Sequence, residues 1–310
     1  MENSSLPNDE CFQNFYVISS SALIPAITLS ILSGVAAVFL NILVIWAIYR
    51  NSSLRSVTNY WVISLAVADL LLGSLGVPVW CIKLFHKARL IFTDVHNLFT
   101  CILVLTLFSS SLNLLALSYD RFVGVTLPLQ YPSRITPTRC GQAIGIIWVS
   151  SCLAAIATLK SKCTVRAQGH FLLFIGIFGI PLIFISYFYF RIFKEARRQK
   201  RLIRIQEACT NQPLFRKENK AAMTVALVIG SFALCWLPSL VDAVIHLFAP
   251  AFWGETRLYL GTTTLACFSS VINPILYSVR NKDFRNTFRS FFMCTKLNRR
   301  SSVSVIFNHA

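Results

Sequence analysis

Charged side chains are scarce in this chain of 310 residues: Asp, Glu, Lys and Arg together make up 13% of it. That is about half the share typical of soluble domains, whereas 55% of the residues are hydrophobic. A soluble fold could not hide so much apolar surface from water. The composition therefore excludes an ordinary soluble protein and favours one that is surrounded by lipid.

Clusters of histidine, cysteine and carboxylate are also missing from the predicted helices. The chain has 5 His, and only His246 lies well inside a predicted helix, close to its end. Because an intramembrane enzyme needs a positioned base, nucleophile or metal set, we expect no enzyme. The sequence shows no inverted repeats or paired broken helices, and one buried carboxylate makes no polar pore stripe. A transporter or channel is therefore only a remote alternative.

Long apolar runs are what the sequence does contain. A spanning helix needs about 20 mostly apolar residues, and the sequence predicts an all-α membrane protein with a seven-transmembrane helix bundle over 22–279. Residues 1–21 lack a basic start and a small-residue cleavage site, so the first helix is expected to serve as its own insertion signal. The seven predicted spans are roughly 22–49, 57–83, 94–126, 139–159, 168–194, 218–248 and 256–279.

Positive charge is distributed unevenly between the predicted loops. Most of the 29 Lys and Arg residues fall on one side, above all between Arg191 and Lys220 and between Arg280 and Arg300. The positive-inside rule then predicts an extracellular N-terminal segment over 1–21 and a cytoplasmic C-terminus. The net charge of +17 reflects this topology and attraction to anionic inner-leaflet lipid, so no nucleic-acid partner is expected.

The segment after the last span combines apolar and basic positions. Arg side chains separate phenylalanines at helical spacing over 280–292, which predicts a short amphipathic helix on the membrane surface. A cytoplasmic tail over 293–310 would follow. Its Cys294 is a candidate for palmitoylation, with an unmodified thiol as the open alternative. In the extracellular segment, Asn3 begins an Asn-Ser-Ser sequon and is a predicted glycosylation site.

Asp69 is the one clear carboxylate predicted deep inside a span, where its charge costs about 2.5–3.5 kcal/mol on insertion scales. Asn41, Ser110 and Asn273 are predicted at a similar depth. A carboxylate with hydroxyl and amide oxygens suits a small hard cation, and sodium is the best candidate. A structural Asp, protonated or held by amides, is an equally good interpretation.

Prolines interrupt three of the predicted spans, at Pro181, Pro238 and Pro274. Each proline removes one backbone hydrogen bond and kinks its helix. A kink converts a small rotation on one side into a larger movement on the other. The three spans are therefore candidates for moving parts.

Five motifs, in order along the chain, resemble the motif set of rhodopsin-like (class A) G-protein-coupled receptors. The resemblance covers about 20–292. Within that family, "YFRIFKEARRQ" and "RNKDFRNTFR" are most similar to the adenosine receptors. The five motifs are "SLAVADLLL", "DRF" with "PLQY" after it, Trp148, "FALCWLP" and "NPILY".

The resemblance implies a switch at the inner face. Arg121 would pair with Asp120 and with Glu218 at the base of helix six, and ligand binding would move helix six outward and free Arg121 for a heterotrimeric G protein. It further implies a multi-pass plasma-membrane protein, an unknown extracellular ligand, and arrestin and receptor kinases as possible partners. The other implied switch residues are Phe122, which replaces the family's usual Tyr, and Tyr189, Tyr277, Asn273 and Pro274.

The sequence departs from the family at the predicted outer face. Most relatives join the top of helix three to the second outer loop by a disulfide, but His96 stands at that helix-three position. Cys163 in the loop should find a partner in an oxidising compartment. Cys11 is the candidate, and Cys81 and Cys101 are open alternatives.

The predicted pocket departs further from the adenosine receptors. Ala243 stands where they hold adenine with an Asn, and Ala266 and Cys267 stand where they carry a small polar residue and a His. A nucleoside would leave its polar groups unpaired there, so adenosine is not the expected ligand. A functional adenosine receptor with an altered pocket is the alternative. Leu103 replaces the Asp of amine receptors, and the seventh span has no Lys to hold retinal.

An apolar pocket suits a lipid-like or small apolar ligand, or no ligand at all. Charges at its rim are each expected to be solvated surface; they are Lys83, Asp242, His246 and Arg257. Phe232 would lie below Trp236 at the pocket floor. The predicted wall consists of Leu103, Val104, Leu107, Trp236, Leu240, Ala243, Ala266 and Cys267.

Overall fold

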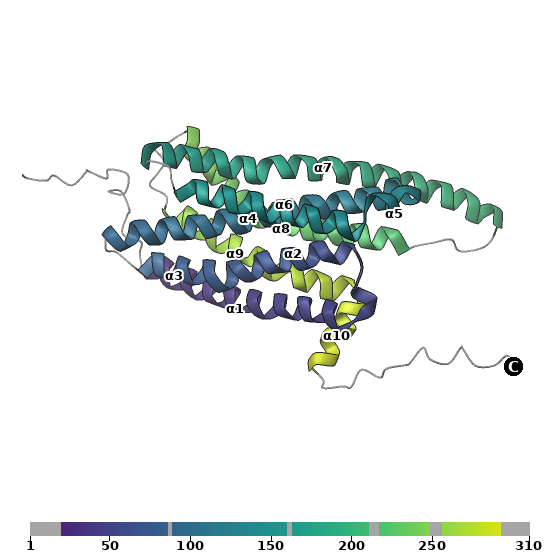
Figure 1. Ribbon diagram of the computed structural model, residues 1–310, viewed down its shortest axis with the longest axis horizontal. Helices are drawn as coiled ribbons and strands as arrows, with labels where there is room; N and C mark the ends of the chain where they lie inside the picture. The colour runs from purple at the N-terminus through teal and green to yellow at the C-terminus, as the bar shows by residue number, and fades with distance from the viewer. Residues whose placement is uncertain (1–19, 86–88, 160–162, 211–216, 249–255, 293–310) are drawn as a thin grey trace, which may run out of the picture.

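The computed structural model describes residues 20–85, 89–159, 163–210, 217–248 and 256–292. Every described element is a helix, and the long helices run side by side along one axis (Figure 1). The long helices are α1 (Ser20–Arg50), α2 (Thr58–Leu71), α3 (Val77–Phe85), α4 (Arg89–Thr126), α6 (Pro137–Leu159), α7 (Cys163–Thr210), α8 (Lys217–Phe248) and α9 (Thr256–Arg280).

Short elements connect or follow the long ones. A π-helical turn, η3 (Leu72–Gly76), joins α2 to α3, so that together they form the second predicted span. The remaining short elements are η2 (Ser52–Leu54), η4 (Pro128–Gln130), α5 (Tyr131–Arg134) and α10 (Lys282–Phe292).

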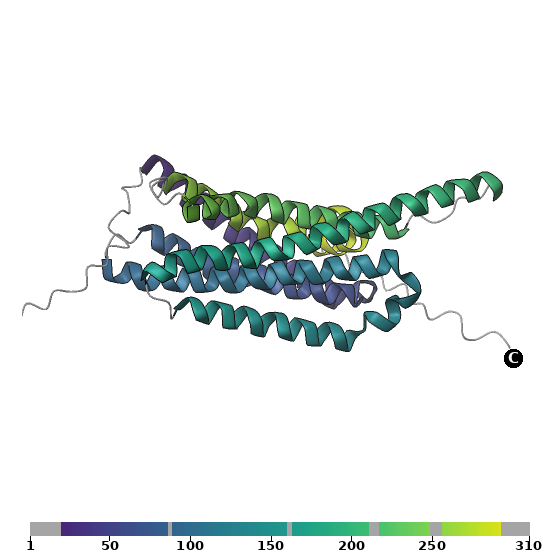
Figure 2. The ribbon, with the colours of Figure 1, turned by 90° about the horizontal axis from the view of Figure 1, so that it is seen from above.

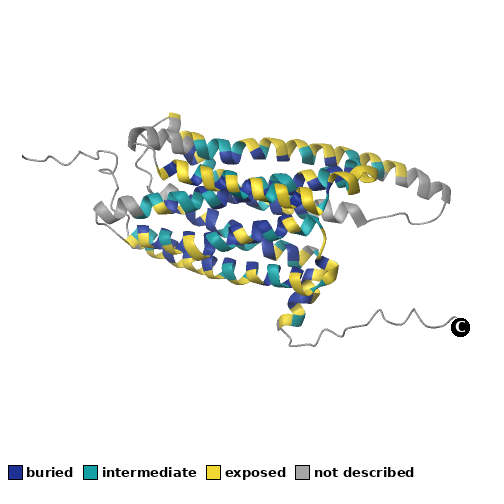
Figure 3. Cartoon of the chain, viewed as in Figure 1, coloured by how far each residue is buried: buried dark blue, intermediate teal, exposed yellow. Residues whose placement is uncertain are grey.

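Six helices in the described part are long and apolar enough to cross a membrane. The helix α9 is not among these six, but it covers the seventh predicted run and packs against α1 and α8. Side chains on the outward faces of α6 and α7 are largely exposed, whereas those facing the bundle are buried (Figure 3). The candidate spans are Ser21–Arg50, Thr58–Phe85, Val95–Thr126, Pro137–Leu159, Leu172–Gln199 and Thr224–Ile245.

The helix α4 is the centre of the bundle. It packs against α2, α6, α7 and α8, and its Leu114, Leu117 and Val123 are fully or almost fully buried. Helix α4 also carries Asp120 and Arg121 near its C-terminal end.

Helix α1 and the π-helical turn approach each other through two glycines. A Cβ on Gly34 would lie 2.9 Å from Val77 Cγ1 and 3.2 Å from the carbonyl oxygen of Gly73. A Cβ on Gly73 would lie 3.0 Å from the carbonyl oxygen of Gly34. At these three distances a Cβ would fit only if Val77 or the neighbouring backbone shifted, so the close approach of α1 and η3 is favoured by glycine at both positions.

Helix α10 turns away from the bundle axis at the end of the molecule where α5 lies (Figure 1). It begins two residues after the start of the predicted amphipathic segment, and the Asn281 side chain accepts a hydrogen bond from the Asp283 amide, 2.9 Å. Phe284 and Phe288 are buried against the bundle, so two of the four phenylalanines predicted for the apolar face pack on protein. Phe291 is exposed and contacts Trp46 edge to face.

One predicted boundary is wrong. The fifth predicted span ends at about residue 194, but α7 continues as one helix to Thr210 and extends beyond its neighbours (Figures 1 and 2). Two side-chain hydrogen bonds support the helix just beyond the predicted end of the span. Arg198 donates to Glu195 at 3.0 Å, and Gln199 donates to Glu195 at 3.2 Å. Such pairs three and four residues apart support a helix.

Candidate functional site

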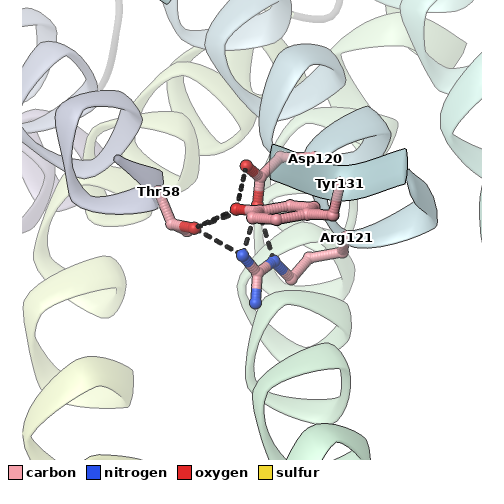
Figure 4. A network of polar contacts seen from close by, with 4 residues as sticks. All are labelled: Thr58, Asp120, Arg121 and Tyr131. Carbon is pink, nitrogen blue, oxygen red and sulfur yellow. Dashed lines mark hydrogen bonds and ion pairs between the residues drawn. The ribbon is translucent and has the colours of Figure 1, made fainter. Parts of the chain in front are cut away.

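A polar network lies near the C-terminal end of α4 (Figure 4). Asp120 is 0% exposed, and its carboxylate accepts a hydrogen bond from Arg121 Nε at 2.8 Å. Arg121 Nη2 donates to the same carboxylate and to Thr58 Oγ1. The hydroxyls of Thr58 and Tyr131 approach Asp120 Oδ2 at 3.1 Å and Oδ1 at 3.0 Å. Residues from α2, α4 and α5 thus surround one buried carboxylate.

The hydroxyl protons of Thr58 and Tyr131 decide which of these contacts can be hydrogen bonds and in which direction. Thr58 and Tyr131 each carry one hydroxyl proton, and both are used if each donates to Asp120. The 3.3 Å contact between the two hydroxyls then has no proton of its own. Burial raises the pKa of Tyr131 above its ordinary value, so this hydroxyl keeps its proton. The network is therefore a carboxylate held by three side chains, one of which is Arg121.

Phe122, Tyr189 and Tyr277 are three further switch residues that the resemblance implies. Phe122 stacks on Phe188 of α7 with 5.2 Å between ring centroids. The hydroxyls of Tyr189 and Tyr277 are buried and have no hydrogen-bond partner among the described residues. Since buried hydroxyls are usually paired, both are suited to a second arrangement of the helices in which they gain partners.

A hydrogen bond between α7 and α4 could not be predicted from the sequence. Gln199 Nε2 donates to the Val125 carbonyl at 3.1 Å, where the last carbonyls of α4 have no partner within their own helix. No motif marks a residue 74 positions away from its partner. The same holds for Thr58. Tyr131 lies in the "PLQY" motif, but the motif by itself assigns no role to the hydroxyl.

Asp69 lies in the middle of the bundle, as predicted, and is buried. Its Oδ1 accepts from Ser270 Oγ at 2.7 Å, and its Oδ2 accepts from Asn273 Nδ2 at 3.0 Å. Asn41 is brought to the same place, because its Nδ2 donates to the Ser270 carbonyl at 3.0 Å. Ser110 is buried on α4 but makes no hydrogen bond with Asp69 in the described part. Ser270 is the member of this group that sequence reasoning missed.

Aromatic rings fill the bundle beside the predicted pocket floor. Trp236 is buried, and its Nε1 donates to Ser269 Oγ at 3.1 Å. The ring centroids of Phe232 and Trp236 are 6.1 Å apart, so Phe232 lies beside the residue predicted to form the pocket floor. Phe174 and Phe178 of α7 continue the row.

The three prolines predicted inside spans all lie inside helices. Pro238 and Pro274 lie inside α8 and α9, and Pro181 lies inside α7.

The predicted pocket wall falls into separate groups. Val104, Leu107, Trp236 and Ala266 belong to the main core, with Leu103 and Leu240 packed against it. Cys267 instead lies with Cys81, Ile27 and Val77 between α9, α3 and α1, and Ala243 is buried apart from both groups. The predicted wall residues therefore do not form one cluster in the described part of the chain.

The charged residues at the rim of the predicted pocket were expected to be exposed to water. For Lys83 and Asp242, the two whose side chains the structure describes, this expectation is wrong. Lys83 is 4% exposed and Asp242 is 5% exposed. Charged side chains are usually exposed to water, but Lys83 on α3 and Asp242 on α8 face neighbouring helices and are therefore buried.

Several predictions lie outside the described residues or side chains. These are the disulfide between Cys163 and Cys11, the glycosylation of Asn3 and the palmitoylation of Cys294. The side chains of Glu218, His246 and Arg257 also lie outside the described part.

Comparison with known proteins identifies the family. Residues 40–277 match the family described as "7 transmembrane receptor (rhodopsin family)". The chain is 31% identical to the adenosine receptor A2a of Canis lupus familiaris, over 88% of this chain and 73% of that protein. It is 32% identical to the histamine H2 receptor of Cavia porcellus, over 94% and 84%. It is 30% identical to the alpha-1A adrenergic receptor of Oryzias latipes, over 86% and 67%.

The chain belongs to the rhodopsin family of G-protein-coupled receptors. It is therefore a multi-pass membrane receptor and not an enzyme, and its family implies a G protein and an extracellular ligand as partners. The resemblance to adenosine receptors is supported in part, because a histamine receptor and an adrenergic receptor have about the same identity to this chain.

Proposed function

We propose that this receptor transmits the binding of an extracellular ligand to a heterotrimeric G protein through outward movement of the inner end of α8. The observation that carries the proposal is the network around Asp120, in which Arg121 is held inside the bundle by Asp120 and Thr58. A second packed state would release Arg121 toward the G protein, and a ligand would act by favouring that state. Glu218 is the proposed second acidic partner of Arg121.

The remaining parts of the proposal follow from topology. A seven-span bundle with an extracellular N-terminus would place the Asp120 network and α10 on the cytoplasmic side, where α10 would lie along the membrane surface. Its Arg285 and Arg289 are exposed and are suited to anionic lipid headgroups. Arrestin and receptor kinases would act on this same side of the membrane.

Loss of the Tyr131 hydroxyl should raise signalling in the absence of ligand. Tyr131→Phe removes one of the donors to the buried Asp120 carboxylate. A hydrogen bond to a charged group is worth about 1.5–3 kcal/mol, so the closed state would lose stability and basal signalling would rise by about tenfold or more. Nucleotide exchange on membranes containing equal amounts of receptor measures this.

Ser133→Ala is the matched control for Tyr131→Phe. Ser133 lies on the same short helix, is exposed, and donates only to the Gln130 carbonyl. Its removal should leave basal exchange unchanged. Equal basal exchange in wild type and Tyr131→Phe would contradict the role of the network in closing the inner face.

A sodium ion at Asp69 is part of the proposal. Asn273 Oδ1 is buried and has no hydrogen-bond partner among the described residues, so an amide oxygen as well as the Asp69 carboxylate could face a cation. Ser110 on the adjacent helix would add a hydroxyl oxygen. Bound in this way, the ion would stabilise the closed state by tying α2, α4 and α9 together.

Asp69→Asn should abolish the effect of sodium on the receptor. In wild type, replacing potassium by sodium at constant ionic strength should raise the melting temperature and lower basal nucleotide exchange. The neutral amide at 69 keeps the hydrogen bond from Ser270 but lacks the charge that attracts the ion. If sodium has no effect on wild type, or the same effect on both proteins, the cation site is wrong.

We also propose that adenosine is not the ligand. Ala243 and Ala266 are buried and offer no side-chain hydrogen bond to a nucleoside. The alternative is a functional adenosine receptor that holds the nucleoside by other groups. Cyclic AMP in cells expressing the chain, measured during an adenosine titration, distinguishes the two, since a response that requires Arg121 would establish the alternative.

A further inference from the structure

The outward face of α7 changes from apolar to basic at one point along the helix. Seven of its exposed residues recur at alternating spacings of three and four, so they lie on one face (Figure 3). We call the first four of them the apolar stripe and the next three the basic stripe. In chain order these residues are Ile180, Ile183, Tyr187, Phe190, Lys194, Arg197 and Arg201.

The apolar stripe has the length of one leaflet of a bilayer. At about 1.5 Å of rise per residue it covers about 15 Å, which is half of the roughly 30 Å hydrocarbon core. Ile183 is 69% exposed and Phe190 is 65% exposed, whereas other faces of α7 pack against α4 and α8. The apolar stripe is therefore open to the acyl chains of a lipid.

Two contacts hold cations beside the end of the apolar stripe. Arg191 Nη1 donates to the Tyr187 hydroxyl at 3.0 Å. The guanidinium carbon of Arg197 lies 4.1 Å from the ring centroid of Phe193, which is a cation–π contact. Since Tyr187 and Phe193 are themselves exposed, both guanidinium groups lie over apolar surface on the outside of the bundle, where a phosphate can reach them.

The segment that contains the basic stripe is strongly positive. Residues 191–202 include six Lys or Arg and one acidic residue, Glu195. Glu195 forms a salt bridge with Arg198, with 3.0 Å between Oε2 and Nε, and Arg198 lies outside the basic stripe. The basic stripe therefore keeps its positive charge, and anions are the partners that complement it.

The cations of the basic stripe follow one another along the helix axis. Lys194 and Arg201 are seven residues apart, which corresponds to about 10 Å along the axis. Because α7 runs along the bundle with the other long helices (Figure 1), these cations lie at different depths. A lipid with a single phosphodiester places its phosphate at one depth and can meet only the first of them. A headgroup with further phosphates on a ring extends away from the hydrocarbon and can meet the others.

We propose that this face of α7 binds a polyphosphorylated inositol phospholipid of the cytoplasmic leaflet. The acyl chains lie along the apolar stripe, and the phosphates lie against the basic stripe. The proposal rests on the proposed function for its topology, which places this end of α7 in the cytoplasm. It adds a lipid partner that is distinct from the extracellular ligand and from the G protein.

The test uses the full-length receptor, purified in a nonionic detergent, and three probes. The probes are phosphatidylinositol bisphosphate, phosphatidylinositol with the same acyl chains, and soluble inositol trisphosphate. The two lipids differ only in the ring phosphates, and the soluble probe lacks the acyl chains. Native mass spectrometry measures how much of each probe is bound when the three compete at equal concentrations.

In wild type, the bisphosphate lipid should bind at least about tenfold more tightly than phosphatidylinositol, because several basic residues each attract its ring phosphates. It should also bind at least about tenfold more tightly than the soluble trisphosphate, because its acyl chains are held in the micelle against the apolar stripe. In the triple variant Lys194→Gln, Arg197→Gln, Arg201→Gln, the preference between the two lipids should fall below about threefold.

The triple variant should fold, because all three positions are exposed and Gln has a helix propensity close to those of Lys and Arg. The preference is a ratio within each protein, so a change in the stability of a variant does not affect it. The double variant Arg197→Gln, Arg201→Gln provides a second test if the triple variant does not fold, and it should lower the same preference by a smaller factor.

The matched control removes three positive charges from other exposed positions at the same end of the bundle. It is the variant Arg50→Gln, Arg55→Gln, Arg134→Gln, and it should keep the wild-type preference. The proposal is overturned if wild type binds the two lipids equally or if the soluble trisphosphate binds as tightly as the lipid. It is also overturned if the preference survives in the triple variant of the basic stripe, or if the control loses it equally, which would identify bulk charge as its source.

Failure of this proposal is distinguishable from failure of the proposed function. Lipid binding is measured in micelles without a G protein, so it depends neither on coupling nor on topology. If the triple variant of the basic stripe keeps the lipid preference but loses nucleotide exchange, the stripe contacts the G protein and the lipid proposal is wrong. If the lipid binds as expected and wild type drives exchange on no heterotrimer, the lipid site stands and the coupling is wrong.

Discussion

Arg121→Ala should lower nucleotide exchange on the coupled G protein by at least about tenfold, while the receptor still reaches the cell surface. Arg121 is the one member of the Asp120 network that can leave it and carry a positive charge to a partner. Thr58 and Tyr131 remain to hold the Asp120 carboxylate when the guanidinium is gone. The bundle should therefore fold, but the released state would lack the group that meets the G protein.

The measurement is exchange on purified heterotrimers of each class, with receptor in nanodiscs at equal density. The double variant Tyr131→Phe, Arg121→Ala makes the test stronger, since Tyr131→Phe alone should raise exchange. If the double variant keeps that raised exchange, Arg121 has no part in coupling. Surface labelling of a tag at the N-terminus shows whether a low signal reflects coupling or transport to the membrane.

Gly34→Val should destabilise the receptor more than the other variants considered. A Cβ at 34 would lie 2.9 Å from Val77 Cγ1 and 3.2 Å from the Gly73 carbonyl oxygen. Helix α1 would have to move away from η3, and overpacking of this kind costs about 1–3 kcal/mol or more. We expect a melting temperature lower by several degrees and a reduced amount of folded receptor in detergent.

Gly145→Val is the matched control for Gly34→Val. A Cβ at 145 on α6 would meet no atom within 4 Å. Both substitutions replace a helical glycine by the same β-branched residue, so the intrinsic change in helix propensity is similar. If both variants lose the same amount of stability, the close contact between α1 and η3 is not the cause.

The positions of the long helices could be predicted because a bilayer demands long apolar runs, which few other structures produce. The ends were harder to predict. The helix α7 runs on beyond its apolar part to Thr210, and the hydrogen bonds that Arg198 and Gln199 donate to Glu195 support the first turn of this extension. The π-helical turn at Leu72–Gly76 leaves no clear signal, since its two glycines fit a close helix contact equally well.

The Asp120 network could be predicted only in part. The motif resemblance brought Asp120 and Arg121 together, and adjacent residues need no tertiary information to pair. Thr58 comes from a different helix, 62 residues away from Asp120, and its role depends on packing that no local pattern encodes. The same limit applies to Ser270 and Asp69, which lie 201 residues apart.

Lys83 shows why a general rule failed. Considered alone, a charged residue near the end of a span is most often solvated. The structure instead packs this position between aromatic rings of α3 and α4. Whether a helix-end charge faces water or a neighbouring helix depends on the rotation of the helix, which the apolar runs leave undetermined because nearly all faces are apolar.

The most direct test of the central claim is the distance between the inner ends of α5 and α8. Spin labels are placed at Ser133 and Leu227, both of which are exposed, through a ketone-bearing unnatural amino acid because the chain contains 10 Cys. Labels at Ser133 and Tyr60 report on the fixed side of the bundle. Pulsed electron paramagnetic resonance measures each pair with and without the coupled, nucleotide-free G protein. The proposed function predicts that the Ser133–Leu227 distance increases while the Ser133–Tyr60 distance stays constant, and an unchanged Ser133–Leu227 distance would contradict it.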